Sequence, residues 1–168
     1  MNIFTKLTSV LAAVLLTSGP GLARIEDNTD ELLDLVSQSG VEVTVNDSIY
    51  CLSGQYYGVY AWADDYRGIH LCPGDTVEPI DHATVRHEVM HAIQHCVNVK
   101  RQTSLDTSVL TPEKLKISAD IHLTRRKLEQ IAYMYSPEEL PIEIEAFLAQ
   151  ELYTATQLMI MYEEHCVA

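Results

Sequence analysis

Basic residues are scarce in this 168-residue sequence, which contains 11 Lys and Arg against 24 Asp and Glu and has a formal net charge of −13. A surface this acidic repels phosphate backbones and anionic headgroups, which argues against nucleic-acid or membrane binding as the main task. Basic or neutral partners fit better. Excess acid also keeps an exported protein soluble, so the charge by itself does not indicate a substrate preference.

Long hydrophobic runs are also lacking. The longest apolar stretch, from Leu7 to Leu16, is shorter than the about 20 residues that a membrane-spanning helix needs. With Lys6 before it and the small-residue site Gly21-Leu22-Ala23 after it, the stretch predicts a signal peptide over residues 1–23. We therefore expect a secreted or periplasmic protein with no integral membrane span in the mature chain and a single domain over 24–168.

Closely spaced cysteine pairs are absent as well. The four cysteines, Cys51, Cys72, Cys96 and Cys166, contain no C-x-x-C pair, and an even count in an exported protein favours two disulfides over a thiolate metal site. Of the three possible connectivities we favour Cys51 with Cys72 and Cys96 with Cys166. The first pairing closes a strand–turn–strand segment, and the second ties the chain end to a helix. A buried free thiol at Cys96 is the alternative.

Strand patterns come early in the chain and helix patterns come late, with no internal repeat and no domain linker. This order predicts an α+β fold in which a small twisted antiparallel or mixed sheet precedes the central and C-terminal helices. The predicted elements are a short helix over 30–36, strands over 41–45, 56–62 and 69–72 with a turn over 64–68, a helix of about sixteen residues after Asp81, a connector over 98–110, and helices from Thr111 to about Tyr135 and from near Pro141 to about Glu164.

The motif His87-Glu88-Val89-Met90-His91 is the feature of the sequence that indicates a chemical function. Residues i and i+4 share one helix face with Cβ atoms about 6 Å apart, so both imidazoles can bind one Zn²⁺. Glu88 lies about 100° further round, where it can act as the general base. Apolar residues at helical spacing fall on the other side of the helix, which makes it amphipathic. A surface helix with unrelated histidines is the alternative.

A catalytic zinc site usually has three protein ligands, so a third must come from elsewhere. On the last predicted helix, Glu145 lies beside the apolar stripe, and a carboxylate there is costly to bury unless a cation balances it. Glu143 projects to nearly the opposite side. We therefore favour Glu145 as the third ligand over Glu143, Glu151 and the remaining histidines. His95 is about 12 Å from His87 along the helix, which suits a rim residue or a partner of a ligand rather than a ligand.

The HExxH motif, followed downstream by Glu145-Ala146-Phe147, resembles the zincin metallopeptidases, and within them the gluzincin branch. The resemblance implies a twisted sheet before the active-site helix, an edge strand lining the substrate cleft and a second helix that brings a glutamate. Here Ile69-His70-Leu71 would take the edge position. Two departures stand out. Ala149 replaces the aspartate that orients a histidine in many gluzincins, and Gln94 stands where the metzincin branch has Gly.

The sequence thus predicts an exported zinc-dependent hydrolase, most simply a small metallopeptidase acting on a peptide or protein. Zn²⁺ would be held by His87, His91 and Glu145, with Glu88 as the catalytic base. Two alternatives stay open: a non-enzymatic binding or structural module on a zincin scaffold, and a zinc amidohydrolase. The substrate and the oligomeric state are not indicated.

Overall fold

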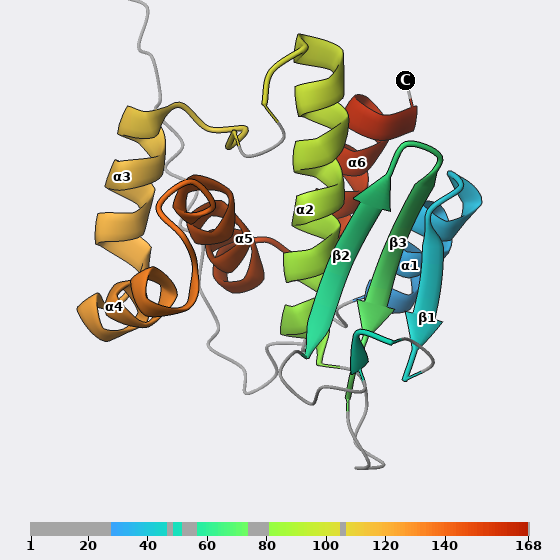
Figure 1. Cartoon of the computed structure of the whole chain (residues 1–168), viewed down its shortest axis with the longest axis horizontal. Coiled ribbons are helices and arrows are strands. Elements are labelled where there is room, and N and C mark those ends of the chain that lie inside the picture. Colours follow the sequence, from blue (N-terminus) through green and yellow to red (C-terminus); the bar gives the residue numbers. More distant parts are fainter. Residues whose placement is uncertain (1–27, 47–48, 52–56, 74–80, 105–106, 168) are drawn as a thin grey trace, which may run out of the picture.

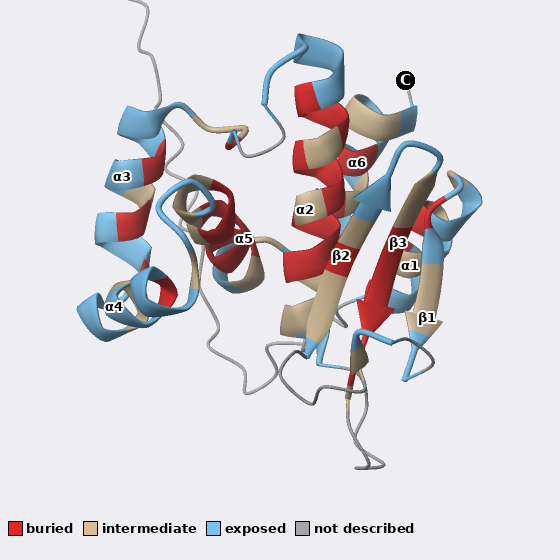
Figure 2. Cartoon of the chain, viewed as in Figure 1, coloured by how far each residue is buried: buried red, intermediate tan, exposed pale blue. Residues whose placement is uncertain are grey.

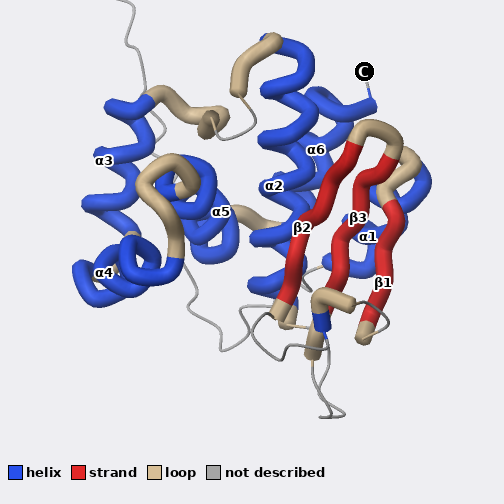
Figure 3. Tube along the Cα trace, viewed as in Figure 1, coloured by secondary structure: helices blue, strands red, loops and turns tan. Residues whose placement is uncertain are grey.

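The computed structural model describes residues 28–167 apart from 47–48, 52–56, 74–80 and 105–106. Its elements confirm the α+β class, with a three-stranded mixed sheet and six α-helices (Figures 1 and 3). The predicted signal peptide, the start of the second predicted strand and the segment before Asp81 lie outside the described residues. No helix among the described residues is long and apolar enough to cross a membrane.

The sheet has the order β1-β3-β2. β1 (Glu42–Val45) pairs in parallel with β3 (Tyr66–Leu71), and β2 (Gly58–Ala63) forms an antiparallel hairpin with β3. The strand around Ile69 is therefore central, and the expectation that it forms an edge is wrong. β2 holds the edge position beside the motif helix instead. The hairpin turn is also tighter than predicted, because β3 already begins at Tyr66.

Three helices cover one face of this sheet: α1 (Thr29–Gln38), α2 (His82–Arg101) and α6 (Ala155–Tyr162). Their buried residues and those of the strands share one hydrophobic core. Buried residues are red along the helices and strands in Figure 2. The core comprises Leu32, Val36, Val41, Tyr60, Ile69, Leu71, Val85, Val89, Met90, Ala92, Ile93, Val97, Ala146, Ala149, Ala155, Leu158 and Tyr162. α2 carries the motif, and Asp81 caps its first turn as the sequence predicts, by accepting a hydrogen bond from the Ala83 N–H.

A second, smaller core lies on the far side of α2, among α3 (Pro112–His122), α4 (Arg125–Met134) and α5 (Leu140–Leu152). The sequence predicted one helix where α3 and α4 stand, and one where α5 and α6 stand. In both places a threonine begins a new helix: Thr124 accepts from the Lys127 N–H, and Thr154 forms a reciprocal capping box with Gln157. A strong cap satisfies the free N–H groups of a new first turn, which allows the chain to change direction.

Both predicted disulfides are present. Cys51 bonds to Cys72, and Cys96 on α2 bonds to Cys166 in the final π-helical turn, Glu163–Val167. No cysteine is free. The second bridge joins the C-terminal turn to the helix that carries the motif, and it closes a sequence separation of 70 residues against 21 for the first.

Removing the longer bridge should therefore destabilise the fold more than removing the shorter one. In the chain-entropy account, the Cys96→Ala/Cys166→Ala protein loses about 4 kcal/mol of unfolding free energy and the Cys51→Ala/Cys72→Ala protein about 3 kcal/mol. Urea denaturation of both double variants beside the wild type measures the two losses. A loss below about 1 kcal/mol for the Cys96 pair would show that this bridge does not stabilise the fold.

Candidate metal centre

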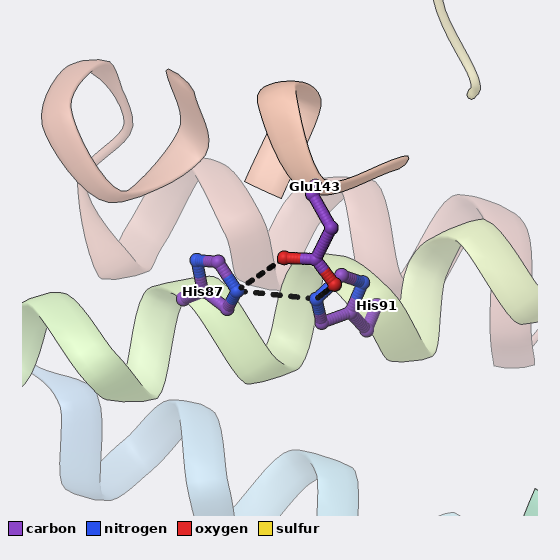
Figure 4. A group of neighbouring side chains, drawn as sticks. All are labelled: His87, His91 and Glu143. Carbon is purple, nitrogen blue, oxygen red and sulfur yellow. Dashed lines mark hydrogen bonds and ion pairs between the residues drawn. The ribbon is translucent and has the colours of Figure 1, made fainter. Parts of the chain in front are cut away.

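Two histidines of α2 and one glutamate of α5 converge in the space between these helices (Figure 4). The Nε2 atoms of His87 and His91 lie 3.2 Å apart, and the Glu143 carboxylate spans the pair, 3.4 Å from His87 Nε2 through Oε2 and 3.5 Å from His91 Nε2 through Oε1. His87 is 7 % exposed and Glu143 is 9 % exposed. All three side chains therefore point inward, toward one another.

Burial keeps both imidazoles neutral. It lowers the pKa of His87 to about 4, with help from the positive charge of Lys127, and it lowers the pKa of His91 to about 4, with help from His87. The contacts with Glu143 are therefore not ion pairs at neutral pH. Instead, the two Nε2 atoms and the carboxylate oxygens face one another, and Glu143 Oε2 has no hydrogen-bond partner among the described residues. Glu143 is thus buried beside two uncharged imidazoles, and burial raises the pKa of its carboxyl group.

A metal cation fits this arrangement. Ligand atoms placed tetrahedrally about 2.0–2.1 Å from one ion are about 3.3 Å apart, close to the three separations seen here. Neutral imidazole and carboxylate are also the protonation states that bind metals. His87, His91 and Glu143 could thus hold a metal ion. In the part of the chain that the structure describes, no other group of three His, Cys, Asp or Glu side chains comes this close together.

The structure brings Glu143, and not Glu145, to the histidine pair. The preference for Glu145 assumed that the helix buries a single stripe, whereas α5 is buried over Ile142, Glu143 and the run from Glu145 to Ala149 because it packs between α2 and α3. Leu152, which follows Leu148 at helical spacing, is 40 % exposed. A helix enclosed on several sides does not reveal from its apolar pattern which face meets a given neighbour.

Glu145 has a different set of partners. It is 2 % exposed and accepts hydrogen bonds from Gln94 Nε2 at 2.9 Å and from the backbone N–H groups of Val109 and Leu110, each at 2.7 Å. Three donors thus satisfy this carboxylate without a metal ion. Glu151, the other alternative, is exposed on the last turn of α5.

Glu88 is buried between α2 and β2, where it accepts a hydrogen bond from the Tyr60 backbone N–H. Gly58 makes this position possible, because a Cβ on Gly58 would lie 2.7 Å from Glu88 Oε1 and from Thr84 Cγ2. Burial and the negative charge of Glu143 raise the pKa of Glu88 to about 8 in the metal-free protein. The sequence pattern offered no sign that Gly58 is needed for a close approach rather than for a turn.

Other aromatic and polar side chains surround the cluster. The Phe147 ring packs edge-on against His87 with ring centroids 4.6 Å apart, and the Lys127 ammonium lies over Phe147. The Tyr135 side chain at the end of α4 hydrogen-bonds to Glu143, which opposes the rise in the pKa of Glu143 that burial causes. The His95 ring contacts the rings of Tyr60 and Trp62 in an edge-on arrangement. These three side chains and His91 line a small pocket.

The remaining described histidines are not drawn into this centre. His70, on the central strand, is buried and hydrogen-bonds through its two ring nitrogens to Thr44 Oγ1 and to the Tyr66 hydroxyl. His82 hydrogen-bonds to Thr29. These partners are those of structural histidines.

Comparison of this chain with protein-family models, with curated proteins and with solved structures finds no match.

Removing the Glu143 carboxylate should abolish tight binding of a divalent cation, because the two histidines then lack their anionic third ligand. We expect Glu143→Ala to weaken the binding of Zn²⁺ by more than 100-fold in a competition titration against a chromophoric chelator. Glu151→Ala removes an exposed carboxylate from the same helix and should change the affinity less than twofold. Equal affinities in the two variants would contradict the assignment of Glu143.

The burial of Glu88 also predicts a pH effect in the metal-free protein. Its folded pKa of about 8 exceeds the ordinary value of 4.5, so protonated Glu88 contributes stability that is lost as pH rises between these values. The neutral side chain of Glu88→Gln does not titrate. The unfolding free energy of the wild type, minus that of Glu88→Gln, should therefore fall from pH 4.5 to pH 8 when urea denaturation is followed with chelator present. A difference independent of pH would show that Glu88 is ionised in the fold.

Proposed function

We propose that this protein is a zinc-dependent hydrolase with peptidase activity, and that the group formed by His87, His91 and Glu143 is its metal centre. The observation that carries the proposal is the convergence of two neutral imidazoles and a carboxylate at separations of 3.2–3.5 Å. A two-histidine, one-glutamate set suits Zn²⁺ and occurs in catalytic zinc sites. The HExxH motif, which in metallopeptidases adds a general base beside such a set, supports hydrolysis.

The number of protein ligands favours a catalytic centre over a structural one. Structural zinc sites are closed by four protein ligands, whereas catalytic sites have three and leave a position for water. Within the described ranges only three side chains converge, although the group is well buried. A non-enzymatic module in which the metal supports the fold is the second candidate, and the burial of the group is the observation that favours it.

Zinc bound in this group would polarise a scissile carbonyl and lower the pKa of a water molecule toward about 7. The chain itself provides Glu88, which lies beside the first histidine and has its carboxylate near β2. In this proposal Glu88 accepts the proton of the attacking water and passes it to the leaving amine. A base must be ionised, and a dication held next to Glu143 would lower the pKa of Glu88, because it offsets the negative charge that helps to raise it.

The disulfides and the pattern of residues 1–23 bear on where the protein is located. Two disulfides are typical of proteins that fold in an oxidising compartment, and they are compatible with an extracellular protein. Together with the leader-like pattern of residues 1–23, they support export to the periplasm or beyond the cell as part of this proposal. A peptide or protein substrate is proposed from the resemblance to metallopeptidases, and a zinc amidohydrolase would use the same residues.

The test separates hydrolysis from metal binding. Glu88→Gln should retain stoichiometric zinc, measured by elemental analysis of the purified protein, and should lose at least 100-fold in the rate of cleavage of a mixed peptide library. His91→Ala should lose both the zinc and the activity. Zinc-loaded wild type that cleaves neither peptides nor simple amides would favour the structural module. Unchanged turnover in Glu88→Gln would remove Glu88 from the mechanism.

A further inference from the structure

Gln94 links the proposed metal ligand His91 to the carboxylate that the sequence had suggested as a ligand. Gln94 is 2 % exposed and follows His91 by three residues on α2. Its Oε1 lies 2.8 Å from His91 Nδ1, and its Nε2 lies 2.9 Å from Glu145 Oε2 and 2.9 Å from the Ile142 carbonyl oxygen. The three side chains form a continuous hydrogen-bonded chain from α5 to the metal centre.

The chemistry of the partners determines which way the Gln94 amide points. A carbonyl oxygen and a carboxylate oxygen can only accept hydrogen bonds, so the NH₂ group of Gln94 must face Ile142 and Glu145. Its oxygen must then face His91, and it can only accept a hydrogen bond from the N–H group at Nδ1. A neutral imidazole protonated at Nδ1 has its lone pair on Nε2, which is the atom that lies near His87 and Glu143.

Glu145 is in turn held in place by the segment between α2 and α3. The Val109 and Leu110 N–H groups donate to both carboxylate oxygens, so the carboxylate cannot rotate away from Gln94 without breaking these bonds. The Glu145 carboxylate is buried, and both of its oxygens accept hydrogen bonds. A ligand histidine whose second nitrogen is bound in this way is pre-organised for its metal ion.

We propose that Gln94 and Glu145 are positioning residues that hold His91 in the Nδ1–H tautomer, with Nε2 free to bind the metal ion. This inference rests on the proposed metal centre and gives the two residues a role beside it. His87 provides an internal comparison, because its Nδ1 has no hydrogen-bond partner in the described part of the chain. Only one of the two ligand histidines is therefore held in this way.

The tautomers can be measured directly in the metal-free protein from ¹⁵N chemical shifts of the imidazole nitrogens at pH 7.5. We expect His91 of the wild type to carry its proton on Nδ1. In Gln94→Leu, which removes the acceptor, we expect the proton to appear on Nε2 of His91 while the signals of His87 stay unchanged. A His91 that carries its proton on Nε2 in the wild type, or that keeps the Nδ1–H form in Gln94→Leu, would overturn the proposal.

Zinc affinity provides the second measurement. Loss of a residue that orients a ligand weakens metal binding by about 10–100-fold, and we expect a change of this size in Gln94→Leu. Glu145→Gln preserves the shape of the side chain but places an amide among three donors. We therefore expect a smaller loss of zinc affinity than in Gln94→Leu, about threefold or more. Glu151→Gln, an exposed change on the same helix, is the matched control and should leave the affinity unchanged. If Gln94→Leu does not fold, Glu145→Gln provides the test. A Glu145→Gln protein with the same His91 tautomer and the same zinc affinity as Glu151→Gln would overturn the proposal.

The two proposals fail in different ways. If the wild type binds no zinc, the proposed metal centre is refuted, while the tautomer measurement still reports on the hydrogen-bonded chain. If the wild type binds zinc and Gln94→Leu binds it within twofold of the wild type, the metal centre stands and the positioning role of Gln94 and Glu145 is refuted.

Discussion

The packing of α5 against α2 places an ionisable carboxylate beside two imidazoles that burial keeps uncharged, and the rest of the site depends on this contact. A carboxylate in such a place is costly unless a cation or several donors compensate it. Glu143 faces the Nε2 atoms of two imidazoles that carry no charge at neutral pH. The group formed by His87, His91 and Glu143 could therefore hold a metal ion.

The two glutamates near the start of α5 show how the same constraint is met in two ways. Glu145 receives three hydrogen bonds and needs no cation. Glu143 lies two residues earlier, and one of its carboxylate oxygens has no partner among the described residues. The difference arises because Glu145 faces Gln94 and the N–H groups of the connector, whereas Glu143 faces the histidine pair. In the proposed centre, Glu143 would bind the metal ion and Glu145 would hold Gln94, which contacts His91.

The architecture supports this division. A disulfide fastens the end of the chain to α2, and the hydrophobic core holds α2 against the sheet. Gly58 lets β2 approach closely enough for the Tyr60 N–H to bind Glu88. The proposed base, Glu88, thus contacts the sheet, whereas the histidines of the proposed metal centre contact Glu143 of α5. Among the described elements, the motif helix α2 alone contributes to both.

Local features of the sequence were sufficient for the α+β class, for the helix over the HExxH motif with its Asp81 cap, and for both disulfides. The fold class and the capped helix depend on periodicity and capping, which are properties of neighbouring residues. Cysteine parity predicted two disulfides, and the expected positions of the strands and the helix favoured their pairing. The breaks at Thr124 and Thr154 were missed because apolar periodicity continued across them. Only the tertiary structure decided that β3 is central and that Glu143 meets the histidines. It alone also showed that Gln94 and Glu145 are joined. Those facts depend on the strand order and on which sides of α5 are covered. When a helix is buried on several sides, its apolar pattern does not predict which neighbour each side will contact.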